Sequence, residues 1–286
     1  MAAGPPYSID YAVAERDAGQ DKTCFFNEHV PPLFARTVRE AHPQKFDAIL
    51  VDEAQDFDPS WYAPLLGLLN PDTQSLLVTL DGLQGIYARK KFYWKDVDIQ
   101  AQGRVVKLQK AYRNPAEIGK AATRILPKNL TDLVGTGDEF LATQEYARNG
   151  GQIDVAILPD KAAGLEHVAR KAREFLDRNW SILISFRQNV SKFGLNHPIH
   201  AALARQGVPQ SNIANGGPAS NLISIATPQS AKGLEADAVI IPDADGYDSP
   251  DEFQLLHVAI LTRAWRAHLV QEHHATRGNQ RVCFRM

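Results

Sequence analysis

The sequence predicts an α/β protein whose parallel sheets are divided between two domains. Apolar runs with the length and character of strands recur along the 286 residues, and helical stretches separate several of them. Strands that alternate with helices form parallel sheets, because a parallel connection needs a crossover that is usually a helix. A chain of this length can hold two domains, each with its own core. One strand-like run ends in a dense group of acids, at the end of a strand where open α/β sheets bind ligands.

The strand-like runs begin near residue 48, and we expect helices in several of the gaps between them. The expected strands are Ala48–Val51, Ser75–Leu80, Val105–Leu108, Ile153–Leu158, Ser181–Phe186, Leu222–Thr227 and Ala238–Ile241. The expected helices include Ala116–Ile125, Gly164–Asp177 and Ile199–Gln206. The first 45 residues and the tail after Gln271 show little pattern, and residues 207–221 have the composition of a polar loop.

Composition excludes several classes of protein. Hydrophobic residues make up 44% and charged residues 22%, as in a globular protein, and the net charge of −2 means that any basic surface must be local. Cys24 and Cys283 lie near opposite ends, so we expect neither a disulfide framework nor a cysteine metal site. The sequence has no signal peptide and no apolar run of ~18 residues. We therefore expect a soluble, cytoplasmic protein with no membrane partner.

The acids follow the first expected strand, in the stretch FDAILVDEAQDFD of residues 46–58. Its run Ala48–Val51 has the character of a strand covered on both faces. A strand that ends in Asp-Glu is the Walker B arrangement, in which Asp52 holds Mg²⁺ and Glu53 orients and deprotonates the attacking water. The alternative is an acidic loop that caps a helix beginning near Pro59.

The next expected strand, Ser75–Leu80, leads to Gln84, which is placed to sense a terminal phosphate beside Asp52 and Glu53. It is followed by RKKFYWK at residues 89–95, which contains four cations and three aromatic residues. Cations and stacking faces are what a groove for single-stranded nucleic acid requires. The alternative is a solvated hairpin whose aromatic residues lie partly in the core.

Two arginines lie far apart in the sequence, Arg113 just after an expected strand and Arg263 near the C-terminus. Each alone would by default be a surface residue. If both converge on a phosphate, they neutralise the charge that develops during phosphoryl transfer.

Taken in order, these segments resemble the superfamily 1 DNA helicases of the UvrD, Rep and PcrA type. VDEAQD resembles motif II of that family, DGLQGIY motif III, AYRNPAEI motif IV, TPQSAKGLE motif V and AILTRA motif VI. The resemblance covers residues 47–264 and keeps the motifs in the family's order, which makes it specific. It implies two RecA-like domains that bind ATP in the cleft between them and single-stranded DNA across their tops.

The resemblance also implies a role for each matching residue. It assigns Asp52 to Mg²⁺ and Glu53 to the catalytic base, and it places Glu235 at the ribose and Gly233 at the phosphates of ATP. The residues that would contact the γ-phosphate are Gln84, Arg113 and Arg263.

Single-stranded DNA would be held by aromatic and basic residues of motif III and the segment after it, and by motif V. Tyr87 and Trp94 would stack on bases. The full set of expected DNA-binding residues is Tyr87, Arg89, Lys90, Lys91, Trp94, Thr227 and Lys232.

The sequence departs from the family pattern within three motifs. Leu80 replaces the usual Gly of motif III, Ala111 the usual Asn before Tyr112, and Gln229 the usual His of motif V. Because none of these contacts a phosphate, we expect altered coupling between ATP and DNA and no loss of chemistry. The loop of residues 207–221 is also too short for the large accessory domain that bigger family members insert there.

The gravest departure is the absence of the family's phosphate-binding loop, G-x-x-x-x-G-K-T. The nearest candidate ends in Lys22-Thr23, but Asp21 stands where the second Gly must be and Arg16 where the first would fall. We therefore expect residues 1–107 to form a partial RecA-like domain without its phosphate-loop strand. Residues 108–286 are expected to form a second RecA-like domain with motifs IV to VI.

The expected function is the C-terminal part of an ATP-dependent DNA helicase or translocase that is inactive alone because the phosphate cradle is absent. Its expected ligands are single-stranded DNA, ATP and Mg²⁺. The expected partner is the missing N-terminal phosphate-loop region or another chain; either this partner or the first 45 residues should cover the free edge of the Ser75–Leu80 strand. The alternative function is a non-catalytic remnant of a helicase that binds DNA or protein.

Overall fold

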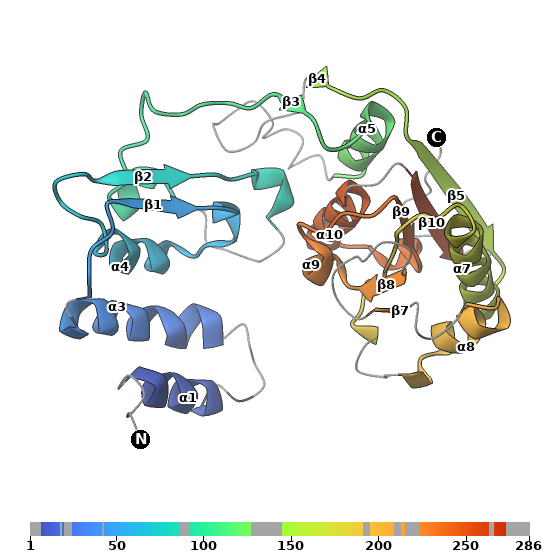
Figure 1. Ribbon diagram of the computed structural model, residues 1–286, viewed down its shortest axis with the longest axis horizontal. Helices are drawn as coiled ribbons and strands as arrows, with labels where there is room; N and C mark the ends of the chain where they lie inside the picture. The colour runs from blue at the N-terminus through green and yellow to red at the C-terminus, as the bar shows by residue number, and fades with distance from the viewer. Residues whose placement is uncertain are drawn as a thin grey trace. The chain divides into compact units, whose positions relative to one another are not determined.

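The computed structural model describes residues 7–17, 19, 25–41, 43–85, 92–126, 145–190, 195–208, 213–214, 223–262 and 266–272. The chain divides into two compact units, Met1–Val106 and Lys107–Met286 (Figure 1). Both units are α/β, and every strand pair within the described ranges is parallel. No helix in the described part of the chain has the length and apolar character needed to cross a membrane.

The first unit is built around a two-stranded sheet of β1 (Ala48–Val51) and β2 (Ser75–Val78). The short helix α4 (Tyr62–Leu66) connects them and lies along one side of the pair in Figure 1. Asp58 caps the 3₁₀ turn Pro59–Trp61 that leads into α4, because its carboxylate accepts the Ser60 N–H at 3.1 Å. The capping alternative is therefore correct for this one acid.

Within the described residues, two helices precede the sheet, although the first 45 residues showed little pattern. These are α1 (Tyr7–Asp17) and α3 (Val30–Ala41), with the π-helical turn Phe25–His29 before α3. Helix α3 packs against α4 and against the turn Pro59–Trp61. These helices add no strand to the sheet, so within the described residues β1 is the only partner of β2. The described N-terminal residues therefore do not cover the free edge of β2 by pairing with it as a strand.

The other face of the β1–β2 sheet is exposed. Leu50 and Leu77, which are opposite each other in the register, are 72% and 56% exposed. Val51, on the opposite face of β1, is buried. The prediction that this strand is covered on both faces is therefore wrong, because only one face of the sheet has helices packed on it within the described residues.

The second unit contains a six-stranded parallel sheet with the order β5-β10-β9-β6-β8-β7. The strands are β5 (Gln152–Leu158), β6 (Ile182–Ser185), β7 (Ile213–Ala214), β8 (Ile223–Ala226), β9 (Ala238–Ile241) and β10 (Arg266–Glu272). A separate short pair joins β3 (Lys110–Ala111) to β4 (Glu145–Tyr146).

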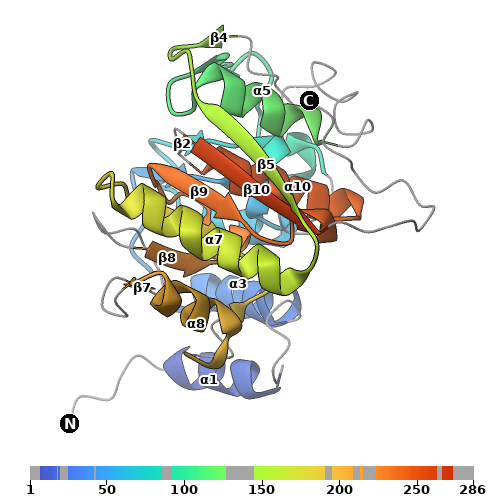
Figure 2. The ribbon, with the colours of Figure 1, turned by 90° about the vertical axis from the view of Figure 1, so that its right-hand side faces the viewer.

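Helices cover both faces of this sheet, as Figure 2 shows. One layer is α7 (Lys161–Leu176) with α8 (Pro198–Arg205); the other is α5 (Ala116–Arg124), α9 (Pro228–Ala231) and α10 (Pro250–Leu261). Neighbouring residues of β6 therefore enter different cores: Ile182 and Ile184 pack under α7 and α8, and Leu183 packs under α10. This two-sided burial explains why β6 is apolar throughout.

Most of the expected elements of the second unit are present, with shifts of a few residues at their ends. The expected strand Val105–Leu108 is wrong: these residues form no strand, and Val106 and Leu108 are 84% and 85% exposed. Strand β10 was missed, although it lies between β5 and β9. The expected loop of residues 207–221 lies largely outside the described residues, except for Gly207 and Val208, which follow α8, and the short strand β7.

Candidate functional site

The acidic residues of the first unit lie at the carboxyl end of β1. The chain turns there at Glu53, whose backbone is left-handed, with φ 54° and ψ 40°, before the 3₁₀ turn Ala54–Asp56. Few non-glycine residues adopt this conformation, and such strain is common at functional sites. Asp52 is held on two sides, since its Oδ1 accepts hydrogen bonds from the Glu53 N–H at 3.0 Å and from the Thr79 hydroxyl.

A chain of hydrogen bonds connects Glu53 to Gln84 across the ends of the two strands. The Gln55 side chain donates to Glu53 Oε2 at 2.5 Å and accepts the Asp81 N–H at 2.9 Å. The Gln84 side chain in turn donates to Asp81 Oδ2 at 2.8 Å. The structure thus brings the three expected nucleotide-binding residues of this unit, Asp52, Glu53 and Gln84, to one edge of the sheet.

Sequence reasoning assigned no role to the residues that hold this edge together: Gln55, Thr79 and Asp81. The signal was present for two of them, because Gln55 lies within VDEAQD and Asp81 begins DGLQGIY. Thr79 carried no signal in the sequence, since its role depends on the parallel register that places it beside Asp52.

The residues at this edge fit Mg²⁺ of the kind found in phosphoryl-transfer sites. That ion keeps several waters and binds one or two carboxylates together with substrate phosphates. Asp52 is an exposed carboxylate at the end of a strand. In the described part of the chain no three His, Cys, Asp or Glu side chains converge as metal ligands, so an ion here would also need water and phosphate oxygens.

The basic and aromatic segment is described only in part. Tyr87, Arg89, Lys90 and Lys91 lie outside the described residues, as do Lys22 and Thr23 of the phosphate-loop candidate. The Trp94 ring makes edge contacts with Tyr62 and Phe92, with centroids 5.7 and 5.4 Å apart.

Tyr93 lies between Phe92 and Trp94 in the sequence, and it is the aromatic residue of the segment that faces solvent. It is 72% exposed, and Lys95 Nζ lies 5.4 Å from its ring centre. The sequence analysis named Tyr87 and Trp94 as the stacking residues and did not name Tyr93. The spacing of Phe92 and Trp94, two positions apart, was the available signal in the sequence. The side chains of these two residues turn to the same side and pack together, so the side chain of Tyr93 turns to the other side.

In the second unit, residues of three motifs come together. Arg113 Nε lies 3.9 Å from Glu235 Oε1, although 122 positions separate them in the sequence (235 − 113). Asn114, which is buried, donates from its side chain to the Leu261 carbonyl at 3.0 Å. Leu261 is the last residue of α10 and lies two positions before Arg263, which is outside the described residues.

The remaining expected residues of motif V surround the short helix α9. Thr227 is its N-cap and accepts the Ser230 N–H at 3.3 Å, and Lys232 is its C-cap. Gly233 has φ +80°, a conformation that a side chain would strain, and among the described residues other than its chain neighbours no atom lies within 4 Å of the place a Cβ would occupy. The backbone turn therefore requires the glycine, and the described residues leave space beside it.

A cavity of about 730 Å³ lies at the carboxyl ends of β6 and β9. After β6 the chain continues to β7, on one side of β6 in the sheet, and after β9 it continues to β10, on the other side, so the connections from these adjacent strands run in opposite directions. Open α/β sheets bind ligands at such a switch point. Residues that line the cavity include Lys161, Phe186, Arg187, Asn196, His197 and Asp243.

The charges that line this cavity are balanced by nearby partners. Arg187 bonds Glu252 at 2.6 Å, and Lys161 Nζ lies 3.9 Å from Asp243. Burial lowers the pKa of His197, whose Nδ1 accepts the Ile199 N–H at 3.3 Å. Sequence reasoning did not identify this cavity, since it is formed by loops that carry no distinctive motif.

No protein-family model matches the chain, and no curated protein matches it. Among solved structures, the chain is similar to one described as the C-terminal domain of a possible DNA helicase from Lactobacillus plantarum WCFS1. The two share 21% sequence identity, the match covers 57% of this chain and 88% of that chain, and the TM-score is 0.40.

Proposed function

We propose that this chain is the C-terminal part of an ATP-dependent DNA helicase or translocase of the UvrD type, with two RecA-like domains. The observation that carries the proposal is the hydrogen-bonded edge of the first sheet, where Asp52, Glu53 and Gln84 are held together. Phosphoryl transfer depends mainly on positioned charges, and these side chains are of the type and in the place that it requires.

Each residue at this edge has a defined task in the proposal. Asp52, fixed by Thr79, would hold Mg²⁺, which would neutralise charge on the β- and γ-phosphates. Glu53, held by the Gln55 amide, would orient the attacking water and accept its proton. Gln84, fixed by Asp81, would contact the γ-phosphate.

The second unit would supply cations for the transferred phosphate. Arg113 is exposed and paired with Glu235 at 3.9 Å, and exposed pairs of this kind contribute only about 0–1 kcal/mol. Arg113 can therefore exchange that carboxylate for a phosphate at little cost. Arg263, Gly233 and Glu235 remain the proposed further contacts with the nucleotide.

Single-stranded DNA is the proposed second ligand. We assign base stacking to Tyr93 together with Tyr87, and backbone contacts to Arg89, Lys90 and Lys91. Trp94 would hold this segment on the first unit, because its ring packs against Tyr62 and Phe92. Thr227 and Lys232 are proposed to act on the DNA side of motif V.

The phosphate cradle is the part that these residues do not supply. We propose that an N-terminal phosphate-loop region or another chain provides it. In the first unit, such a partner would cover the exposed face of Leu50 and Leu77 and the edge of β2 that pairs with no described strand.

Binding of a labelled single-stranded oligonucleotide, measured by fluorescence anisotropy at rising salt, tests the proposal. We expect binding at low salt that weakens steeply, since each cation on a phosphate releases counterions. A duplex of the same length should bind less well because its bases are not available for stacking. A chain that binds neither oligonucleotide at low salt would instead be a remnant with another role, and the proposal would fail.

A further inference from the structure

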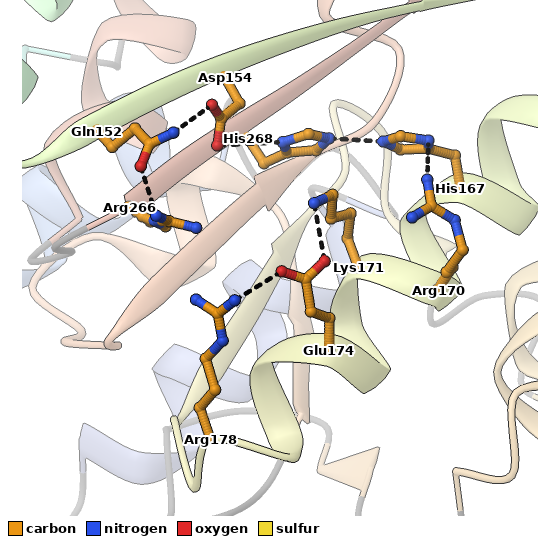
Figure 3. Close-up of polar contacts among 9 residues, drawn as sticks. All are labelled: Gln152, Asp154, His167, Arg170, Lys171, Glu174, Arg178, Arg266 and His268. Carbon is orange, nitrogen blue, oxygen red and sulfur yellow. Dashed lines mark hydrogen bonds and ion pairs between the residues drawn. The ribbon is translucent and has the colours of Figure 1, made fainter.

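Two histidines meet where helix α7 covers the sheet of the second unit (Figure 3). His167 on α7 and His268 on β10 have their Nε2 atoms 2.7 Å apart, and the two ring planes are within 14° of parallel. Arg170, one turn further along α7, lies with Nη2 at 2.8 Å from His167 Nδ1. At the other end, His268 Nδ1 faces Asp154 Oδ2 on β5 at 3.9 Å.

These contacts determine which nitrogen of each ring carries its proton. A guanidinium only donates, so His167 Nδ1 must accept from Arg170, and a neutral His167 must carry its proton on Nε2. That proton points at His268 Nε2, which must therefore accept. The proton of His268 is then on Nδ1, on the side of Asp154.

A second set of donors reaches Asp154 from the strands. Arg266 donates to the Gln152 side-chain oxygen, and the Gln152 amide donates to Asp154 Oδ1 at 2.7 Å. The Gln152 path therefore ends in a hydrogen bond to the carboxylate, whereas His268 Nδ1 is buried, has no hydrogen-bond partner among the described residues and faces the carboxylate at 3.9 Å. The hydrogen bonds from Arg170 to His167 and from His167 to His268 run in one direction, toward Asp154.

The surroundings keep both rings neutral near pH 7. His268 is 3% exposed, and burial, followed by His167 and Lys171, lowers its pKa to about 4. Burial, followed by Arg170 and Lys171, also lowers the pKa of His167, while Glu174 opposes this. Lys171 is bonded to Glu174 at 2.8 Å, and Asp154 favours the charged form of His268.

Uptake of a proton by the histidine pair must change the hydrogen bonds from Arg170 to His268. If His268 binds a proton on Nε2, two N–H groups would face each other at 2.7 Å, so His167 Nε2 must become an acceptor. Neutral His167 then carries its proton on Nδ1, where Arg170 now donates. One proton is taken from water, the hydrogen bond from Arg170 is lost, and no heavy-atom bond changes.

We propose that the His167–His268 pair is a one-proton switch, and that acidification releases the Arg170 guanidinium from α7 to solvent. The charged pair keeps one proton between its two Nε2 atoms, with Asp154 as its counter-ion. Arg170 is an exposed residue, so its release changes the surface of the second unit without unfolding the helix. This inference is independent of the proposed helicase function.

Long-range ¹H–¹⁵N NMR of the imidazoles in the full chain tests the switch between pH 8 and pH 4. Variants His167→Gln and His268→Gln would assign the ring signals, and circular dichroism would define the range in which the chain stays folded. At pH 8 we expect His167 protonated on Nε2 and His268 on Nδ1. On acidification the two rings should bind one proton between them, and the Arg170 Nε signal should move in the same step.

Variants separate the role of Arg170 from a general change of the helix. Arg170→Ala removes both the charge and the donor, so the apparent pKa of the pair should rise by about one unit. Arg170→Gln keeps an N–H donor without the charge and should give a smaller rise. Arg178→Ala, which removes a cation bonded to Glu174 at 2.9 Å, is the matched control and should leave the titration unchanged. Reversed tautomers at pH 8, separate uptake of one proton by each ring, or a titration unaffected by Arg170→Ala would overturn the proposal.

Discussion

In the first unit, neighbouring aromatic residues can differ in burial, and their positions in the sequence alone do not show which of them is buried. Trp94 and Tyr93 are neighbours, yet Trp94 packs against Tyr62 and Phe92 whereas Tyr93 is 72% exposed. The composition of residues 89–95 was enough to predict a segment of cations and aromatic rings. Which ring faces outward depends on the local backbone: Tyr93 is extended, with φ −100° and ψ 146°, and an extended backbone sends alternate side chains to opposite sides.

Substitution of these two neighbours should therefore separate stability from binding. Trp94→Ala should lower the free energy of unfolding of the first unit by about 2–3 kcal/mol, because it opens a gap among packed rings. Tyr93→Ala should change that free energy by less than about 0.5 kcal/mol and weaken binding of single-stranded DNA several-fold. Urea unfolding and fluorescence anisotropy measure the two effects.

Tyr112→Ala is the control for this comparison. Tyr112 is also exposed, and Lys110 Nζ lies 5.8 Å from its ring centre, but no DNA contact is proposed for it. We expect it to leave DNA affinity unchanged. Equal losses for Tyr93→Ala and Tyr112→Ala would show that the effect is not specific to the proposed segment.

His268 should make the stability of the second unit depend on pH. Its pKa in the folded chain is about 4, below the ordinary 6.5, chiefly because of burial. A histidine whose pKa is lowered by folding stabilises the fold fully above pH 6.5, and this contribution is lost as pH falls from 6.5 toward 4. Urea midpoints measured between pH 8 and pH 4 should fall in that window, and His268→Gln should flatten the fall. An equally steep fall in the variant would assign the acid sensitivity to other groups.

At the scale of elements, the second unit followed the sequence pattern more closely than the first. Strands β6 and β9 are buried on both faces, so their apolar runs predicted them. Strand β10 was missed because its sequence RAHLVQE contains polar residues, of which His268 and Gln271 are buried within the unit. The Val105–Leu108 run read as a strand but pairs with nothing described, since pairing depends on distant partners that a local pattern does not include.

In the sheet of the first unit, an apolar run in the sequence was not enough to predict which side chains are buried. Ile, Leu and Val in β1 predicted a strand correctly, but not which of its faces is covered. We expect Leu50→Lys to change the free energy of unfolding by less than about 1 kcal/mol, because Leu50 is exposed, and to reduce self-association at high concentration.

Val51→Ala in the same strand is the matched comparison. Val51 is 4% exposed, so its truncation should destabilise the first unit by about 1–3 kcal/mol. Urea unfolding compares the stabilities, and analytical ultracentrifugation compares the association. If Leu50→Lys destabilised the unit more than Val51→Ala, the face that carries Leu50 would be covered in solution.

For the molecule as a whole, sequence and structure agree on α/β architecture, and residues named from motifs come together within each unit. Asp52, Glu53 and Gln84 share one sheet edge, and Arg113 meets Glu235. The groups that hold these side chains in place, such as Gln55 and Asp81, became apparent only from the hydrogen bonds. The cavity at the ends of β6 and β9 was not predictable either, since it depends on strand order.

DNA-stimulated ATP hydrolysis tests the central claim most directly, measured for this chain alone and for the chain with the phosphate-loop region of a UvrD-type helicase fused in front. The account predicts no stimulated hydrolysis by the chain alone, because the remaining contacts must order a flexible polyanion next to Asp52 and Glu53 without a cradle. The fused chain should hydrolyse ATP, and Glu53→Gln in it should abolish turnover while ATP still binds. Hydrolysis by the chain alone that is lost on Lys22→Ala, or hydrolysis by the fused chain that survives Glu53→Gln, would contradict the account.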